Sequence, residues 1–202
     1  MPEATTTEKI IIDAARDVFY AKGFDGARMH DIAREAGINQ ALLHYYFRSK
    51  DKLFEAVFRE ALARTFPLFF SILESDMALE EKIGRFVGTY IDHLVANPYL
   101  PGFLMHELSR NPNRVRDMVG SSVGRRPSKI LEQYETGVRE GRYVPMDPRQ
   151  FVVSMIGLCV IPFMARPIIQ MLLGVDDKNY PSFLNERKTM VTQFILKAIK
   201  TS

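Results

Sequence analysis

Residues 29–47 have the sequence MHDIAREAGINQALLHYYF, and this stretch decides the fold of the first third of the chain. Apolar residues recur every three or four positions over 29–36, which predicts a short helix. Gly37 can supply the positive φ of a tight turn, and Asn39 is a favoured N-cap residue. A second short helix is therefore expected over 40–47.

Longer helices are expected on both sides of this pair. Gly23 tolerates a left-handed backbone and predicts the end of a first helix, and Ser49 can cap a fourth. Two short helices joined by a glycine-containing turn are the sequence form of a helix-turn-helix. Its expected core consists of Ile32, Ala33, Ile38, Leu43 and Phe47.

The second short helix also has an outer face, which the core does not use. A helix-turn-helix presents the first residues of its second helix to base edges in the major groove. The amide of Gln40 suits a paired contact with adenine. The side chains expected on this face are Gln40, Ala41, Leu42, His44 and Tyr45.

The rest of the chain also has helical periodicity, with breaks at Pro and Gly. Pro67 interrupts an apolar run and marks a domain boundary, either as a linker or as a kink within a continuous helix. No alternating β-branched run predicts a strand, so the expected fold is all-α. Further helices are expected at 79–96, 100–109, 113–120, 126–141, 147–173 and 182–200.

Composition limits the function classes. The chain has 202 residues and a net charge of +3, but residues 1–66 hold ten basic and ten acidic side chains, so bulk charge does not indicate DNA binding. With a single cysteine no intrachain disulfide can form, which fits the cytoplasm, where we expect the protein to act.

The sequence shows no enzyme or metal signature. His106 begins a zinc-protease pattern, but Arg110 stands where the second histidine is required. We expect no catalytic residue, metal or cofactor. The uncharged run 151–165 is shorter than the roughly 20 residues that span a membrane, so we expect a buried helix or subunit interface there and no membrane partner.

Three motifs resemble the DNA-binding domain of TetR-type (TetR/AcrR) transcriptional regulators. They are Gly23-Phe24, then DIAREAGI at 31–38, then HYYFxSKxxL at 44–53. The resemblance implies an N-terminal three-helix helix-turn-helix DNA-binding domain over 6–66. It also implies a C-terminal helical ligand-binding and dimerisation domain over 67–202.

The resemblance further implies function. A homodimer would bind a palindromic double-stranded DNA operator, most often as a repressor, and a small effector would release it. Tyr46 and Lys50 match phosphate-contacting positions of the family, and Arg28 and Met29 stand where it usually has Thr or Ser. The full predicted DNA-binding set is Arg28, Met29, Asn39, Gln40, Ala41, Leu42, His44, Tyr45, Tyr46 and Lys50.

The second domain carries no motif of its own. Its aromatic and methionine content favours an apolar effector. The candidate effector-binding residues are Phe86, Tyr90, Phe103, Met105, His106, Met155, Cys159, Phe163 and Met164. An alternative is a helical DNA-binding adaptor controlled by a protein partner rather than a small molecule.

The last two expected helices, 147–173 and 182–200, are the predicted dimer contact. Paired with a second copy, they would form a four-helix bundle. The side chains expected to be buried in it are Phe151, Val152, Met155, Val160, Met190, Phe194 and Ile195.

Overall fold

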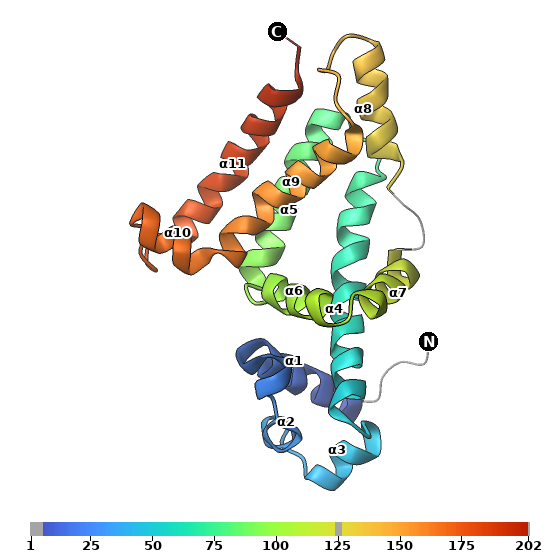
Figure 1. Cartoon of the computed structure of the whole chain (residues 1–202), viewed down its shortest axis with the longest axis vertical. Coiled ribbons are helices and arrows are strands. Elements are labelled where there is room, and N and C mark those ends of the chain that lie inside the picture. Colours follow the sequence, from blue (N-terminus) through green and yellow to red (C-terminus); the bar gives the residue numbers. More distant parts are fainter. Residues whose placement is uncertain (1–5, 124–126, 202) are drawn as a thin grey trace. The chain divides into compact units, whose positions relative to one another are not determined.

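The computed structural model describes residues 6–123 and 127–201. These residues form eleven helices (Figure 1), and their one extended pairing is an isolated bridge between Tyr143 and Lys200, which confirms the all-α fold. The helices are α1 (Thr6–Gly26), α2 (Met29–Glu35), α3 (Gln40–Tyr46), α4 (Lys50–Leu73), α5 (Leu79–Ala96), α6 (Leu100–Arg110), α7 (Pro112–Val123), α8 (Lys129–Arg139), α9 (Pro148–Met164), α10 (Arg166–Leu173) and α11 (Tyr180–Ile199).

Contacts between residues divide the chain into two units. The first unit contains the chain up to Thr65 together with Gly102–Ser122, and the second contains Phe66–Pro101 and the chain from Val123 onward. Helix α4 contributes to both units and continues through Pro67, so the proline lies inside a helix and not in a linker.

The helical path of α1 is broken at Gly23. This glycine has φ 66° and ψ 177°, so the first helix turns where the sequence predicted its end. The turn brings the buried ring of Phe24 against Phe54 of α4, with ring centroids 5.0 Å apart.

Helix α6 packs against the helix-turn-helix within the first unit. The ring of Phe103 lies 5.0 Å from those of Tyr20 and Phe54, measured between centroids. Arg110 pairs with Asp25 at 2.6 Å, and its guanidinium lies 4.5 Å from the centroid of the Phe24 ring. Helix α6 is thereby attached to α1 and α4 although it is distant from both in sequence.

A buried carboxylate holds α6 to α7. Glu107 is 1% exposed, and its Oε1 accepts hydrogen bonds from Arg114 Nε at 2.8 Å and Asn111 Nδ2 at 3.0 Å. The Arg114 guanidinium lies over the Phe54 ring, so the ion pair extends the aromatic core of this unit.

The core of the second unit lies between α5, α8, α9 and α11. Phe151 of α9 stacks on Tyr134 of α8 with ring centroids 4.9 Å apart, and Tyr143 stacks on the same ring. The Tyr143 ring fills the space beside Gly137, where a Cβ would come within 2.1 Å of it. Glycine at this position is therefore a packing requirement.

A buried lysine fixes the carboxyl end of α4. Lys82 is fully buried and donates hydrogen bonds to the Leu73 carbonyl at 2.9 Å and to Gln133 Oε1 at 2.6 Å. Burial lowers the pKa of Lys82. Through this one side chain, the end of α4 is joined to α5 and α8.

The single helix predicted over 147–173 is wrong. The structure has α9 and α10 instead, bent by 79° at Ala165. Pro167 lies in the first turn of α10, where the missing N–H costs nothing, whereas in a continuous helix it would leave the Phe163 carbonyl without its donor. The other helices agree with the sequence within a few residues, but position 126, the predicted start of α8, lies outside the described residues.

Some side chains assigned to a dimer contact lie inside the subunit. Phe151, Met155 and Ile195 belong to the core of the second unit and are at most 4% exposed. Helix α9 is apolar on nearly all sides, so its periodicity could not show which face is buried. Met190 and Phe194 are exposed in the single chain, and their burial against a second copy stays a prediction.

In the described part of the chain, no single helix has the length and apolar character to cross a membrane, and only the bent pair α9 and α10 passes such a test jointly.

Candidate nucleic-acid interface

The turn between α2 and α3 has the geometry that the sequence predicted. Gly37 has φ 66°, and the Ile38 amide donates to the Ala33 carbonyl at 3.0 Å. Asn39 caps α3, because its Oδ1 accepts a hydrogen bond from the Leu42 amide at 2.8 Å. These bonds fix the direction in which α3 leaves the turn.

The inner face of α3 is held by a small apolar core. Leu43 is fully buried and Phe47 is 7% exposed, and Ile32 and Ala33 of α2 are buried as well. Ile38 is half-buried. The predicted core is therefore present, and it fixes which face of α3 points outward.

The outer face of α3 presents the five side chains expected to face bases. All of them are exposed, and the Tyr45 side chain is 80% exposed. The Tyr45 ring meets that of Tyr46 edge-on, with centroids 5.5 Å apart. The exposed set is Gln40, Ala41, Leu42, His44 and Tyr45, and its contact with bases stays a prediction.

Lys50 has partners within the protein. Its ammonium donates to the Phe24 carbonyl at 2.9 Å and to the Ala27 carbonyl at 3.1 Å, and it lies 4.4 Å from the centroid of the Phe24 ring. An ammonium has three N–H groups, so the third can still donate a hydrogen bond to a phosphate. Lys50 thus joins the start of α4 to the end of α1 and to the chain between α1 and α2.

The other predicted backbone-contacting residues lie at helix ends. Arg28 is exposed at the N-cap of α2 and makes no side-chain capping bond, and Met29 begins that helix half-buried. Tyr46 is half-buried at the end of α3. Ser49 performs the capping predicted for α4, since its Oγ accepts from the Lys52 amide at 3.2 Å.

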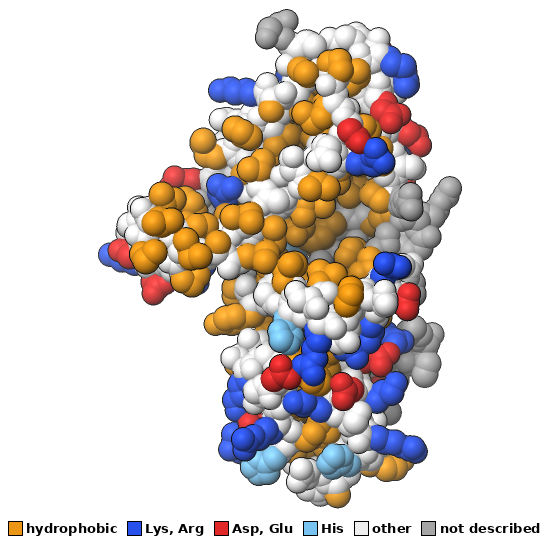
Figure 2. Space-filling model, in the orientation of Figure 1, with side chains coloured by type: hydrophobic (Ala, Val, Ile, Leu, Met, Phe, Trp, Pro, Cys, Tyr) orange, Lys and Arg blue, Asp and Glu red, His pale blue; other side chains and the backbone are white. Residues whose placement is uncertain are grey.

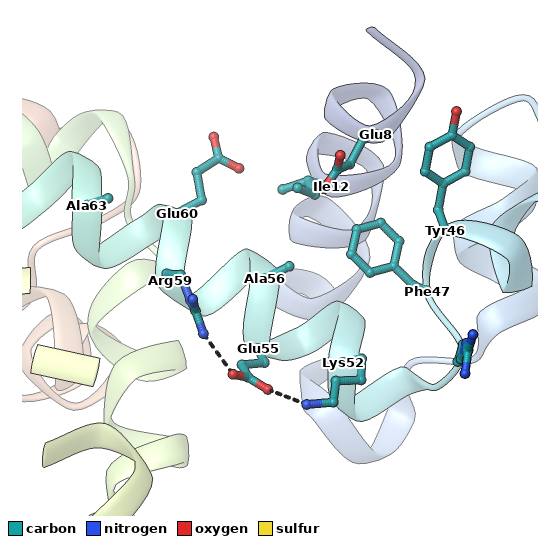
Figure 3. A pocket seen from close by; sticks show the side chains of 11 residues that line it. Glu8, Ile12, Tyr46, Phe47, Lys52, Glu55, Ala56, Arg59, Glu60 and Ala63 are labelled. Atoms are coloured by element: carbon teal, nitrogen blue, oxygen red, sulfur yellow. Dashed lines mark hydrogen bonds and ion pairs between the residues drawn. The ribbon is translucent and has the colours of Figure 1, made fainter. Parts of the chain in front are cut away.

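An open hollow of about 680 Å³ adjoins the interface (Figure 3). It lies between the start of α1, the end of α3 and one face of α4. Three basic side chains, Arg48, Lys52 and Arg59, line it and were missed by the sequence analysis. Arg59 pairs with Glu55 at 2.9 Å, and Lys52 pairs with the same carboxylate at 3.4 Å. The Glu55 carboxylate therefore offsets part of the positive charge of Lys52 and Arg59.

Comparison with known proteins decides the family. A model of the tetR family of bacterial regulatory proteins matches residues 11–57, and one of the tetracyclin repressor-like C-terminal domain matches residues 80–195. The chain belongs to the TetR family of bacterial transcriptional regulators. Its helix-turn-helix is thus the DNA-binding domain of a transcriptional regulator.

Individual TetR-family members match along nearly the whole chain. The HTH-type transcriptional regulator RutR of Escherichia coli K12 is 46% identical over 200 residues, covering 96% of this chain and 90% of RutR. The probable HTH-type regulator YttP of Bacillus subtilis is 23% identical and covers 92% of both chains. The fatty acid degradation regulator FadR of Bacillus halodurans shares the fold, with a TM-score of 0.66 at 20% identity over 96% of each chain.

The candidate effector residues of this TetR-family chain lie in both units. Phe86, Met155 and Cys159 are buried in the core of the second unit; Tyr90 and Phe163 pack against it half-buried, and Met164 is exposed. Burial raises the pKa of both Cys159 and Tyr90 to about 12, so neither is ionised near neutral pH. In the first unit, Phe103 lies in the aromatic core, while Met105 and His106 are exposed.

Proposed function

We propose that this protein is a ligand-responsive repressor that binds a palindromic operator as a homodimer and is released by a small apolar effector. The proposal rests on the exposure of the side chains on the outer face of α3. Its leading side chains are exposed while Leu43 and Phe47 hold the helix from behind. A helix held in this way can enter a major groove without rearrangement of its own core.

Phosphate contacts would orient α3 on the duplex. Arg28 is exposed at the start of α2, and Lys50 retains one N–H beside the bonds it donates to the protein. Such contacts add affinity without selecting a sequence, whereas Gln40 and His44 would distinguish base pairs.

Exposed apolar side chains on α9 and α11 support the homodimer. Val153 and Ile161 of α9 and Met190 and Phe194 of α11 are each more than half exposed. Large apolar side chains gathered on adjacent helices mark an interaction surface. An isologous contact would place the same surface of a second copy against them.

Helix α4 supports a coupling between effector and operator. It begins beside the recognition helix at Lys50, and its last turn is joined to α5 and α8 by Lys82. The carboxyl end of α4 belongs to the domain proposed for residues 67–202, and its amino end belongs to the domain proposed for residues 6–66. A shift of the carboxyl end would therefore move the amino end as well, because α4 is one continuous helix. A coupling free energy of about 1–3 kcal/mol is typical of such regulation.

Selection of genomic fragments with the purified protein tests this function. The fragments should share an inverted repeat whose half-sites are centred about 34–36 Å apart, or a multiple of that spacing, with two chains bound per repeat. A screen of small apolar molecules should then find one that releases the complex. Asymmetric sites bound by one chain would contradict the homodimer, and release by a protein alone would favour the adaptor.

A further inference from the structure

Helix α10 has no buried residue of its own. Met171 is 75% exposed, Leu172 69% and Leu173 66%, and Ile168 adds a fourth large apolar side chain. Figure 2 shows hydrophobic side chains gathered over this helix. A short helix with such a surface gains little from its own subunit, because apolar area left in water contributes no stabilisation.

An apolar groove of about 360 Å³ begins where α10 begins. Its lining includes Val95 and Tyr99 from the end of α5 and the chain that follows, Phe163 of α9, and Tyr180 and Leu184 of α11. Arg166, the one charged residue of the lining, pairs with Asp177 at 2.7 Å and lies over the Tyr180 ring. Because its charge is already compensated, the groove suits an apolar occupant and not an anion.

The helix does not fill the groove of its own subunit. Arg166 and Pro167 line the groove, but no residue of α10 after Pro167 does so. The exposed apolar side chains of α10 therefore lie outside the groove of their own subunit.

The exposed apolar side chains of α10 follow directly in the chain on those of the proposed dimer contact. Ile161 and Met164 are exposed at the end of α9, and Ile168, Met171 and Leu172 are exposed on α10, on the other side of the 79° bend. In an isologous dimer, a contact from one copy is repeated by the other. Since α10 and the groove lie at the same end of the unit, α10 of each copy can lie in the groove of the other copy.

We propose that α10 is an exchanged arm whose Met171–Leu173 segment lies in the groove beside Val95 and Tyr99 of the second copy. The inference rests on the proposed homodimer and adds to it. Each copy completes a pocket of the other, so the groove is filled only in the dimer.

Cross-linking between two differently tagged chains tests the exchange. Both carry Cys159→Ser; one also carries Leu172→Cys and the other Tyr99→Cys. After subunit exchange, a short bismaleimide should link the two chains, and the tags distinguish this product from links between identical chains. In the control pair, the second chain carries Val144→Cys in place of Tyr99→Cys. Val144 bonds to Ile199 at the far end of α11, about 30 Å from its start, and should not be linked.

Charged variants separate the arm from the dimer itself. Met171→Glu with Leu172→Glu should raise the dimer dissociation constant at least roughly tenfold in sedimentation experiments, since two apolar contacts are lost. Met146→Glu, at an exposed position between α8 and α9, should leave it unchanged. Phe194→Glu should weaken the dimer through α11.

The outcomes can be told apart. If Phe194→Glu weakens the dimer but the arm variant and the cross-link show no effect, the exchanged arm is wrong and the proposed homodimer stands. If wild-type protein remains a single chain at all concentrations, the proposed homodimer fails and the arm fails with it. Equal linking of the two cysteine pairs would also overturn the exchange.

Discussion

Lys50 illustrates how one side chain of a DNA-binding domain can serve its own fold. The sequence marked it as a phosphate contact through a family resemblance, and the structure adds bonds to the carbonyls of Phe24 and Ala27. Neither carbonyl could be foreseen, because the partners are 26 and 23 residues away and depend on the turn at Gly23.

Lys50→Ala should therefore change stability as well as binding. The loss of two charge-assisted hydrogen bonds should lower the free energy of unfolding by about 1–2 kcal/mol. If Lys50 also contacts a phosphate, binding should weaken on all duplexes and the salt slope should fall by about one unit. Urea unfolding and salt-titrated binding measure the two effects.

Lys52→Ala is the matched control, because Lys52 is exposed and pairs only with the nearby Glu55 among the contacts described. Its stability should stay near that of the wild type. An unchanged unfolding free energy for Lys50→Ala would contradict the bonds to the two carbonyls.

Substitution of Gly137 tests the packing against Tyr143. Gly137→Ala places a Cβ 2.1 Å from the buried Tyr143 ring, so the free energy of unfolding should fall by about 1–3 kcal/mol. Gly88→Ala, in open space inside α5, should instead raise it by about 0.5–1 kcal/mol. Thermal melts of both variants check the pair, and equal effects would refute the packing argument.

Local chemistry predicted most helix ends. Gly37, Asn39 and Ser49 act through their own backbone or nearest neighbours, so their roles were visible in the sequence. The bend between α9 and α10 was not predicted. Pro162 lies inside α9 without ending it, while Pro167 lies in the first turn of a new helix, and the presence of a proline does not by itself distinguish the two cases.

Substitutions of Asn39 test whether its side-chain cap stabilises α3. Asn39→Ala removes the acceptor for the Leu42 amide and should cost about 1 kcal/mol of stability. Asn39→Ser keeps a capping oxygen and should recover most of this loss. Urea unfolding of both variants measures the difference, and equal loss in the two would show that the cap is not the cause.

The sequence could not show to which unit α6 belongs. The predicted limits grouped it with residues 67–202, whereas contacts group Gly102–Ser122 with the helix-turn-helix. The pair Arg110–Asp25 spans 85 residues, and no periodicity predicts a contact between residues so distant in sequence. For the same reason the sequence could name candidate effector residues such as Phe103 but not show which of them share a core.

The outer face of α3 is the surface that we propose to select the DNA sequence. The most direct measurement is fluorescence anisotropy of a selected operator and a random duplex, with wild type and with the double variant Gln40→Ala and His44→Ala. Because both side chains are exposed, the variant should melt like the wild type but lose roughly tenfold or more of its preference for the operator. An undiminished preference in the folded double variant would contradict the claim.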